Sequence, residues 1–261
     1  MVRSRRPSVA ELRAVAQPVS IFARNSGEHW AGRLYIRRIS PHLTRQLLRT
    51  RITPDGVTSL MILAGVLAAG MLTLPGLLPA IGAVLLIQLQ ILLDCSDGEL
   101  ARWLDRRSPL GVYLDRVGHW VTEALLPIAL GIRADGGWDQ LGTYSALGLV
   151  VAVLVLGVKG ESALVIVARA ESGRPPALDT EAVAAPRHRG LGRVRRVLGR
   201  LPFFRAFVAM EATLLALAAA VVDLGVGDLA ATRVLVVGLI PVAALTLLGH
   251  GLAIVTSDRL R

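Results

Sequence analysis

The chain contains few cysteine, lysine and aromatic residues, and the scarcity of cysteine and of aromatic residues excludes two classes of protein. With one cysteine, Cys95, among 261 residues, no disulfide framework can form within the chain. Aromatic residues make up 4%, too few for the stacking platforms of a nucleic-acid-binding face, although the net charge is +10. Of the 29 basic residues one is a lysine, Lys159, and the arginines flank apolar segments. We therefore expect no nucleic-acid partner.

Apolar residues dominate instead, at 53% of the chain, and several runs are long enough to cross a bilayer. The sequence therefore predicts an all-α integral membrane protein with six transmembrane helices. These helices are expected at residues 57–74, 77–94, 110–131, 140–159, 203–222 and 232–255. The third is the least apolar because it carries Asp115, His119 and Glu123, which should face the bundle interior or a polar cavity.

The distribution of arginine predicts the orientation of the chain in the cell (plasma) membrane. Eleven arginines lie in residues 1–51, seven in 171–202 and three in 95–109, whereas the alternate connections hold two arginines and four aspartates. Arginine collects in cytoplasmic loops, so these three stretches should be cytoplasmic. With six crossings, both termini and the inner ends of the second and third helices then face the cytoplasm.

The segment before the first crossing, EHWAGRLYIRRISPHLTRQLLRT, is predicted to form an interfacial amphipathic helix. Its apolar positions, Trp30, Leu34, Ile39, Leu43 and Leu47, lie near one helical face, and most of its arginines lie elsewhere. Pro41 is expected to break or kink this helix. The alternative is a solvated basic tail. We expect residues 1–51 to be a basic cytoplasmic segment and residues 52–257 a six-helix domain with a cytoplasmic loop at 171–202.

Polar residues gather at the inner ends of the second and third predicted helices. Asp94 and Asp97 lie three residues apart and share a helical face. Gly111, Asp115 and His119 follow at four-residue intervals as one stripe. Because a short connection joins the two helices, the stripes can face each other and bring three carboxylates together with an imidazole. Carboxylates packed so closely need cations to neutralise them, and oxygen ligands select hard divalent ions.

Small and basic residues accompany these carboxylates. Gly98, Ala101 and Gly111 leave backbone exposed where a nucleotide or a diphosphate can approach, and Arg102 can hold phosphate oxygens. Two divalent ions held by shared carboxylates form the usual clamp for displacement at phosphorus. The whole group of residues therefore indicates phosphoryl-transfer chemistry.

The pattern Asp94-x2-Asp97-Gly98-x2-Ala101-Arg102-x8-Gly111-x3-Asp115-x3-His119 resembles the signature of the CDP-alcohol phosphotransferase family. Seven of the eight fixed positions match, and the eighth, an aspartate in the family, is His119 here. Upstream, ITPDGVTSL is similar to the family's entry to its first crossing, where Thr53 would cap the helix and Pro54 would take its first turn.

The resemblance implies a homodimeric membrane enzyme that moves a phospho-alcohol group, such as a phosphatidyl group, from a CDP-linked alcohol to an acceptor hydroxyl and releases CMP. Its donor would be CDP-diacylglycerol or a soluble CDP-alcohol. Its cofactors would be two Mg²⁺ or Mn²⁺ ions, and the enzyme would be in contact with membrane lipid. The implied metal ligands are Asp94, Asp97, Asp115 and His119. The implied substrate-binding residues are Gly98, Ala101, Arg102 and Gly111, with Asp55 and Thr58 as weaker candidates.

His119 is expected to act as the catalytic base or as a metal ligand, because imidazole offers one lone pair at a time. Glu123, one turn further along, is expected to orient the imidazole or to make a structural hydrogen bond. Lys159 and Arg205 are candidates for acceptor binding, or they mark the membrane interface. Two alternative functions remain: a catalytically impaired homologue that binds a CDP-alcohol, and an ion-coupled membrane transporter.

Overall fold

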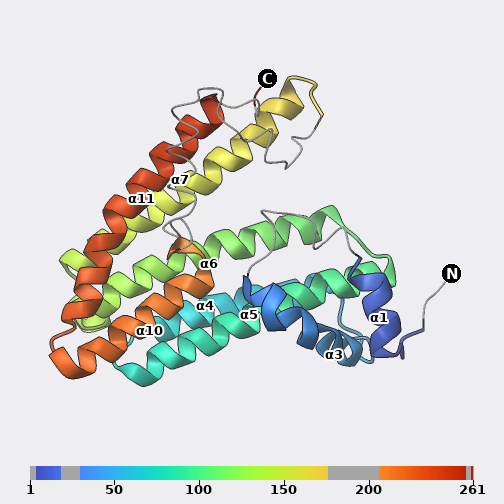
Figure 1. Cartoon of the computed structure of the whole chain (residues 1–261), viewed down its shortest axis with the longest axis horizontal. Coiled ribbons are helices and arrows are strands. Elements are labelled where there is room, and N and C mark those ends of the chain that lie inside the picture. Colours follow the sequence, from blue (N-terminus) through green and yellow to red (C-terminus); the bar gives the residue numbers. More distant parts are fainter. Residues whose placement is uncertain (1–3, 19–29, 176–205, 257–259, 261) are drawn as a thin grey trace. The chain divides into compact units, whose positions relative to one another are not determined.

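The computed structural model describes residues 4–18, 30–175, 206–256 and 260. Within these ranges the chain is helical and contains no strand, which confirms the all-α prediction. Figure 1 shows the elements. They are α1 (Val9–Ala16), η1 (Gly32–Ile36), α3 (Arg37–Leu47), α4 (Pro54–Leu72), α5 (Leu77–Leu104), α6 (Pro109–Asp135), η2 (Trp138–Gln140), α7 (Thr143–Glu171), α10 (Ala209–Val226) and α11 (Ala230–Thr256).

Five of the described helices, α4, α5, α7, α10 and α11, are long and apolar enough to cross a membrane. The chain therefore has the build of a multi-pass membrane protein. The remaining predicted crossing, the third in chain order, corresponds to α6, which has 27 residues and extends over about 40 Å at 1.5 Å per residue. α6 is not among the five apolar helices because it carries polar side chains, including Asp115, His119 and Glu123. The predicted number of six crossings thus stays a prediction.

The observed helix ends differ from the predicted ones where a helix continues beyond its apolar stretch. The second predicted helix ends at residue 94, but α5 continues to Leu104, and the predicted connection 95–109 shortens to 105–108. Asp105 ends the helix in a left-handed conformation, with φ 53°, and Arg106 N then donates to Ala101 O at 2.9 Å. The polar sequence DCSDGELARW is therefore helical throughout.

The predicted interfacial helix forms as η1 followed by α3. Leu34 and Ile39 are 61% and 48% exposed, as expected for side chains that meet lipid, whereas Leu43 and Leu47 pack partly against a buried core. Pro41 is buried inside α3 and does not break it, contrary to one of the two expected effects. Contact of this helix with the membrane stays a prediction.

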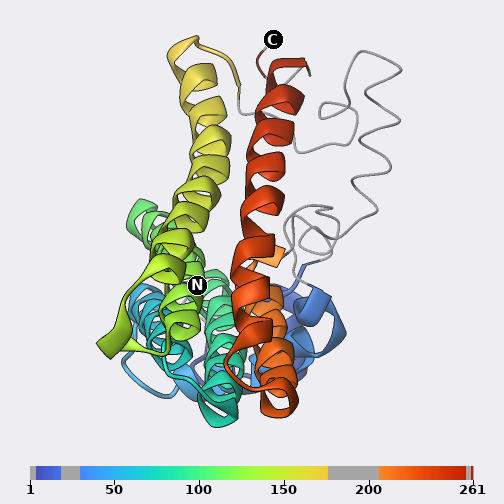
Figure 2. The same cartoon turned by 90° about the vertical axis from the view of Figure 1, so that its left-hand side faces the viewer.

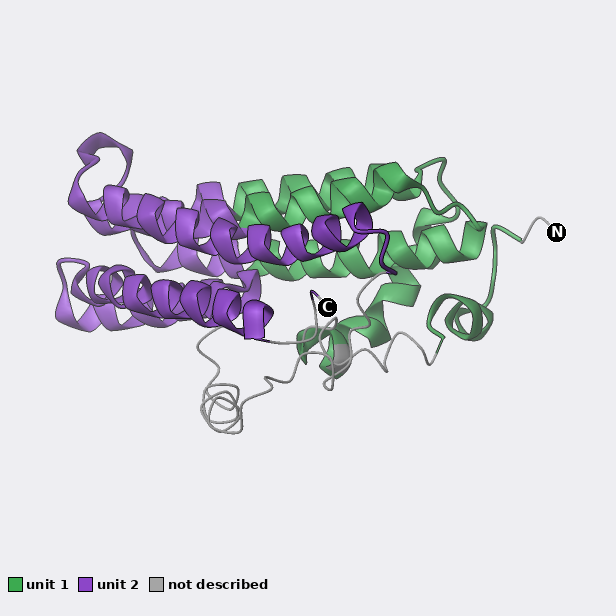
Figure 3. Cartoon of the chain, turned by 90° about the horizontal axis from the view of Figure 1, so that it is seen from above, with its two compact units in different colours: residues 1–68, 85–122 green, residues 69–84, 123–261 purple. Residues whose placement is uncertain are grey.

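The chain forms two compact units, coloured in Figure 3. Unit 1 comprises residues 1–68 and 85–122, and unit 2 comprises residues 69–84 and 123–261, so α4, α5 and α6 contribute to both. A core in unit 1 joins the N-terminal helices to α4 and α5. Its buried members are Leu12, Ala16, Leu48, Val57, Met61, Ala64, Leu93, Leu100 and Trp103. The predicted division at residue 51 concerns function and stays a prediction.

Within unit 2, α7 and α11 lie side by side, as Figures 1 and 2 both show. Gly157 packs against Leu247, and Gly251 packs against Glu161 four residues further along α7. Contacts therefore advance together along both helices, which means that the two helices run in the same direction. The buried Arg133 of α6 donates to Leu74 O at 2.6 Å and to Gly76 O at 2.8 Å, and it ties α6 to the turn between α4 and α5.

Candidate active site

Two capped helix starts define one side of the candidate site, which lies within unit 1. Gly56 N donates to Thr53 Oγ1 at 3.1 Å, and Pro54 is the first residue of α4, so the predicted cap is present. The start of α6 repeats this arrangement. Gly111 N donates to Ser108 Oγ at 2.9 Å, and Pro109 takes the first helical position. Both helices therefore begin at residues fixed by side-chain hydrogen bonds.

The last turns of α5 and the first turns of α6 bring Asp94, Asp115 and His119 together. His119 Nε2 lies 3.3 Å from Asp94 Oδ1 and 3.5 Å from Asp115 Oδ1. One ligand atom from each of the three residues lies within 4.8 Å of the other two. Their side chains are 32 to 43% exposed, so an ion can reach them from outside. The predicted meeting of the two polar stripes is thus present for these three residues.

This group fits a divalent cation. Two ligands of one octahedral Mg²⁺ or Mn²⁺ ion lie about 3 Å apart, so separations of 3.3 and 3.5 Å need only small side-chain movements. Two carboxylates also neutralise the charge of a divalent ion, and the imidazole supplies a nitrogen ligand. The same approach of two carboxylates lets His119 Nε2 share a proton with them instead. Both expected roles of His119 therefore involve Nε2.

Asp97 has a different environment from the three clustered residues. It is 9% exposed, and its Oδ2 accepts a hydrogen bond of 2.6 Å from Thr58 Oγ1 of α4. Thr58 Oγ1 also lies 3.2 Å from Pro54 O, which fixes its rotamer. A carboxylate has two oxygens, so Asp97 can hold Thr58 and a cation at the same time. Thr58 therefore orients the carboxylate of Asp97 by a hydrogen bond. A direct role of Thr58 in substrate binding stays a prediction.

The side chain of Arg102 lies over bare backbone at Gly98. A Cβ added at Gly98 would lie 2.9 Å from an Arg102 terminal nitrogen, so a larger residue would displace the guanidinium. Arg102 Nε donates to Ala16 O of α1 at 2.6 Å. The predicted phosphate-binding arginine is thus held in place by its Nε. Ala101 is half-buried, and its carbonyl receives Arg106 N at the end of α5.

Gly111 and Asp55 lie against each other where α4 and α6 begin. A Cβ at Gly111 would lie 2.8 Å from Asp55 Oδ1, so glycine is needed for this approach. Ser108 Oγ lies 3.2 Å and 3.4 Å from the two Asp55 oxygens and so bonds that carboxylate as well as capping α6. Roles of Gly111 and Asp55 in nucleotide binding stay predictions, but the structure places both beside the start of α6.

Three further candidates, Glu123, Lys159 and Arg205, belong to the part of the chain assigned to unit 2. Lys159 Nζ lies 2.8 Å from Glu123 Oε2, and their side chains are 21% and 13% exposed. Glu123 therefore has the partner inside the bundle that its structural alternative predicts, and its action on His119 stays a prediction. Acceptor binding by Lys159 also stays a prediction. Arg205 lies outside the described residues.

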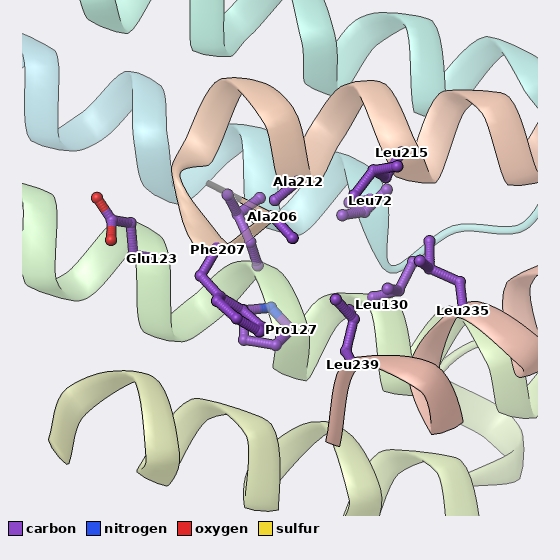
Figure 4. Close-up of a pocket in the computed structure, with 11 residues that line it drawn as sticks. Leu72, Glu123, Pro127, Leu130, Ala206, Phe207, Ala212, Leu215, Leu235 and Leu239 are labelled. Atoms are coloured by element: carbon purple, nitrogen blue, oxygen red, sulfur yellow. The ribbon is translucent and has the colours of Figure 1, made fainter. Parts of the chain in front are cut away.

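An apolar pocket in unit 2 includes Glu123 at one end (Figure 4). Its other lining residues are Leu72, Leu126, Pro127, Leu130, Ala206, Phe207, Ala212, Leu215, Leu235 and Leu239. This lining is otherwise apolar, and its single carboxylate is already paired with Lys159.

Sequence reasoning missed Ser108 and Glu99. Ser108 stands directly before Pro109, a pair typical of a helix start, so a local signal was present. Glu99 lies within the recognised motif at a position that the motif leaves variable, and it is fully buried. A charged residue near the end of a spanning helix needs a partner, but the sequence does not indicate which residue supplies it.

Two curated archaeal proteins are similar to parts of this chain. The "Bifunctional IPC transferase and DIPP synthase" of Thermococcus kodakarensis is 37% identical over 105 residues, which cover 40% of this chain and 23% of that protein. The "Archaetidylinositol phosphate synthase" of Aeropyrum pernix is 35% identical over 130 residues, which cover 49% of this chain and 63% of that protein. The chain therefore spans less than two thirds of the length of either relative. No family model matches it.

Proposed function

We propose that this protein is a membrane phosphotransferase of the CDP-alcohol phosphotransferase type. It would move a phospho-alcohol group from a CDP-linked alcohol to an acceptor hydroxyl and release CMP. The observation that carries the proposal is the meeting of Asp94, Asp115 and His119, within 4.8 Å of one another, on the two helices that bear the motif. The names of the two relatives, a bifunctional IPC transferase and DIPP synthase and an archaetidylinositol phosphate synthase, support the same reaction class.

Asp94, Asp115 and His119 would hold one divalent cation, and Asp97, oriented by Thr58, would hold a second. When bound, the cations neutralise the diphosphate and stabilise charge that develops at phosphorus. We assign His119 Nε2 as a cation ligand because that one atom approaches both carboxylates. Its single lone pair is then occupied, so it cannot also accept a proton.

The remaining oxygen of Asp115 is then the best-placed proton acceptor. This side chain is 43% exposed, the most open of the three clustered residues, so an acceptor hydroxyl can reach it. In the proposed step the hydroxyl oxygen forms a bond to the phosphorus attached to the donor alcohol. The bond from that phosphorus to CMP breaks, CMP leaves, and the hydroxyl proton passes to Asp115. Arg102 would hold the phosphate oxygens that remain with CMP.

The proposed donor is a CDP-linked lipid such as CDP-diacylglycerol, and the proposed acceptor is a polyol or a polyol phosphate. A lipid donor suits a multi-pass membrane protein. A polyol phosphate agrees with the name of the Aeropyrum relative, archaetidylinositol phosphate synthase. Lys159 and Arg205 are the proposed contacts for an acidic acceptor. The enzyme would act in phospholipid biosynthesis, as a homodimer whose active site faces the cytoplasm.

A protein that binds a CDP-alcohol without turning it over is the second candidate. The presence of His119 in place of the motif's last aspartate favours it, because the site has one negative charge fewer. An ion-coupled transporter fits less well. Carriers usually place ionisable groups near the bilayer midplane, whereas these residues lie in the last turns of α5 and the first turns of α6.

The direct test is CMP release by the purified protein. Wild type and Asp94→Asn are incubated with CDP-diacylglycerol or a soluble CDP-alcohol, a panel of polyols and polyol phosphates, and Mg²⁺ or Mn²⁺. We expect CMP release that requires a divalent ion and is lost in Asp94→Asn but kept in Asp139→Asn, a matched change at an exposed residue of η2. Binding of a CDP-alcohol without CMP release would favour the second candidate.

A further inference from the structure

Glu99 is a fully buried carboxylate within the motif, but it points away from the metal-binding stripe. At about 100° per residue, Glu99 lies about 140° around α5 from Asp94. Asp94 and Asp97 therefore use one face of the helix, and Glu99 uses another. Burying a charge costs free energy unless it is paired and hydrogen-bonded. The hydrogen-bond partners of Glu99 should therefore explain why a charged residue is buried at this position.

Both carboxylate oxygens of Glu99 are bonded to residues that precede the first spanning helix. Oε1 accepts hydrogen bonds from Ser40 Oγ at 2.5 Å and from Gln17 Nε2 at 2.8 Å. Oε2 accepts from Thr44 Oγ1 at 2.7 Å. The Arg37 guanidinium lies 3.9 Å from Oε1 and balances the charge. All of these partners lie on the same side of α5. The hydrogen bonds therefore favour one rotation of α5 about its own axis.

Pro41 explains how α1 attaches to α3. Proline has no backbone N–H, so Arg37 O, four residues earlier, loses its helical donor. Gln17 Nε2 fills this gap at 2.9 Å, and Arg13 reaches the next carbonyl, Arg38 O, also at 2.9 Å. The proline that was expected to disturb the helix therefore creates a docking point for the end of α1.

α1 also contacts α5 directly. Arg102 Nε donates to Ala16 O, and Trp103 Nε1 donates at 2.9 Å to the carbonyl of Ser4, which precedes α1. Leu12 and Ala16 of α1 are fully buried in the core of unit 1. The residue proposed to hold phosphate thus has its guanidinium aimed by the last carbonyl of α1.

We propose that α1 and α3 are positioning elements of the active site, which act through Glu99 and Arg102. This inference rests on the proposed function. The contacts fix the rotation of α5 and hence the directions in which Asp94 and Asp97 present their carboxylates. A displacement of about 1 Å in a catalytic group can lower a rate by about a hundredfold, so this constraint matters at the site even though Glu99 touches no substrate.

The test is a Mn²⁺ titration of the full-length protein that yields both the dissociation constant and the number of sites per chain. In Glu99→Ala we expect the Mn²⁺ dissociation constant to rise about tenfold or more, with the number of sites unchanged. Glu99→Gln keeps the volume and one acceptor oxygen, so it should stay within about threefold of wild type. Asp139→Asn, which changes an exposed carboxylate in η2, should leave the dissociation constant unchanged.

A merely structural role would give a different result, since partial unfolding lowers the number of sites but leaves their affinity intact. That result, or an unchanged dissociation constant in Glu99→Ala, would overturn the inference and leave the proposed function standing. Failure of wild type to bind Mn²⁺ would overturn both. If Glu99→Ala does not fold, Gln17→Ala removes one donor without emptying a buried position. It should weaken Mn²⁺ binding by about threefold, and wild-type affinity in that variant would also overturn the inference.

Discussion

His119 is the residue at which this site departs from the pattern that it otherwise matches. Its Nε2 lies 3.3 Å and 3.5 Å from two carboxylate oxygens, where a cation would bind. An imidazole carries no negative charge and is a softer ligand than a carboxylate, so it favours Mn²⁺ or a later metal over Mg²⁺. The identity of one side chain can therefore set the metal preference of the whole site.

His119→Asp should shift the metal preference of CMP release toward Mg²⁺, because it adds a third carboxylate to the group that already contains Asp94 and Asp115. The measurement is the ratio of rates at saturating Mg²⁺ and Mn²⁺ in wild type and variant. His119→Ala should lose at least about a hundredfold in rate. An unchanged ratio in His119→Asp would argue against direct ligation by His119.

Thr58→Ala should lower CMP release by about tenfold, because it removes the hydrogen bond that orients Asp97. Thr58→Ser keeps the hydroxyl and should retain most of the rate, so the pair separates the hydrogen bond from the loss of side-chain volume. Equal rates in wild type and Thr58→Ala would remove this bond from the mechanism.

Sequence reasoning worked at the residue scale where contacts follow helix periodicity. The three- and four-residue spacings that placed Asp94 beside Asp97, and Asp115 beside His119, are local. The bond between Thr58 and Asp97 spans 39 positions, and the bond between Ser40 and Glu99 spans 59. No spacing rule reports such pairs, because they depend on how whole helices pack.

The helices themselves were predictable, but their ends were not. Hydropathy identifies the apolar stretch of α5. The helix itself continues to Leu104 and is terminated by Asp105, which adopts the left-handed conformation. The short helix α1 was not predicted at all. Its signal is a capping box in which Glu11 N donates to Ser8 Oγ at 3.1 Å and Ser8 N donates to Glu11 Oε2 at 2.7 Å.

This capping box should make α1 sensitive to acid. Hydrogen bonds from the backbone and the side chain of Ser8 lower the pKa of Glu11. The stabilising effect is therefore present above the ordinary glutamate pKa of about 4.3 and is lost as the pH falls through the lower pKa of the folded state. The protection factors of the α1 amides, which compare their exchange with that of an unstructured peptide at the same pH, should fall over that range in wild type. Ser8→Ala should show fast exchange at neutral pH, and an identical pH profile in both proteins would contradict the assignment.

At the scale of the whole molecule, composition was a reliable guide to the class of protein, whereas the orientation predicted from the arginine counts stays a prediction. Five helices are apolar enough to cross a membrane, and the chain resembles enzymes of lipid synthesis over part of its length. The donor and acceptor were not predictable, because they depend on pocket shape rather than on the motif.

The orientation can be tested with introduced cysteines, since the native Cys95 is buried. Asp139→Cys in η2 should react with a membrane-impermeant maleimide in intact cells. Arg174→Cys, after α7, should react only when the membrane is opened. Both positions are exposed, so a reversed pattern would mean that the chain is inserted the other way round.

The central claim is that Asp94, Asp115 and His119 hold one divalent cation, and pulsed electron paramagnetic resonance of bound Mn²⁺ tests it most directly. We predict a nitrogen coupling from a directly bound imidazole in wild type that disappears in His119→Ala and persists in His250→Ala. Mn²⁺ that binds without any nitrogen coupling, or a coupling that survives in His119→Ala, would contradict the account.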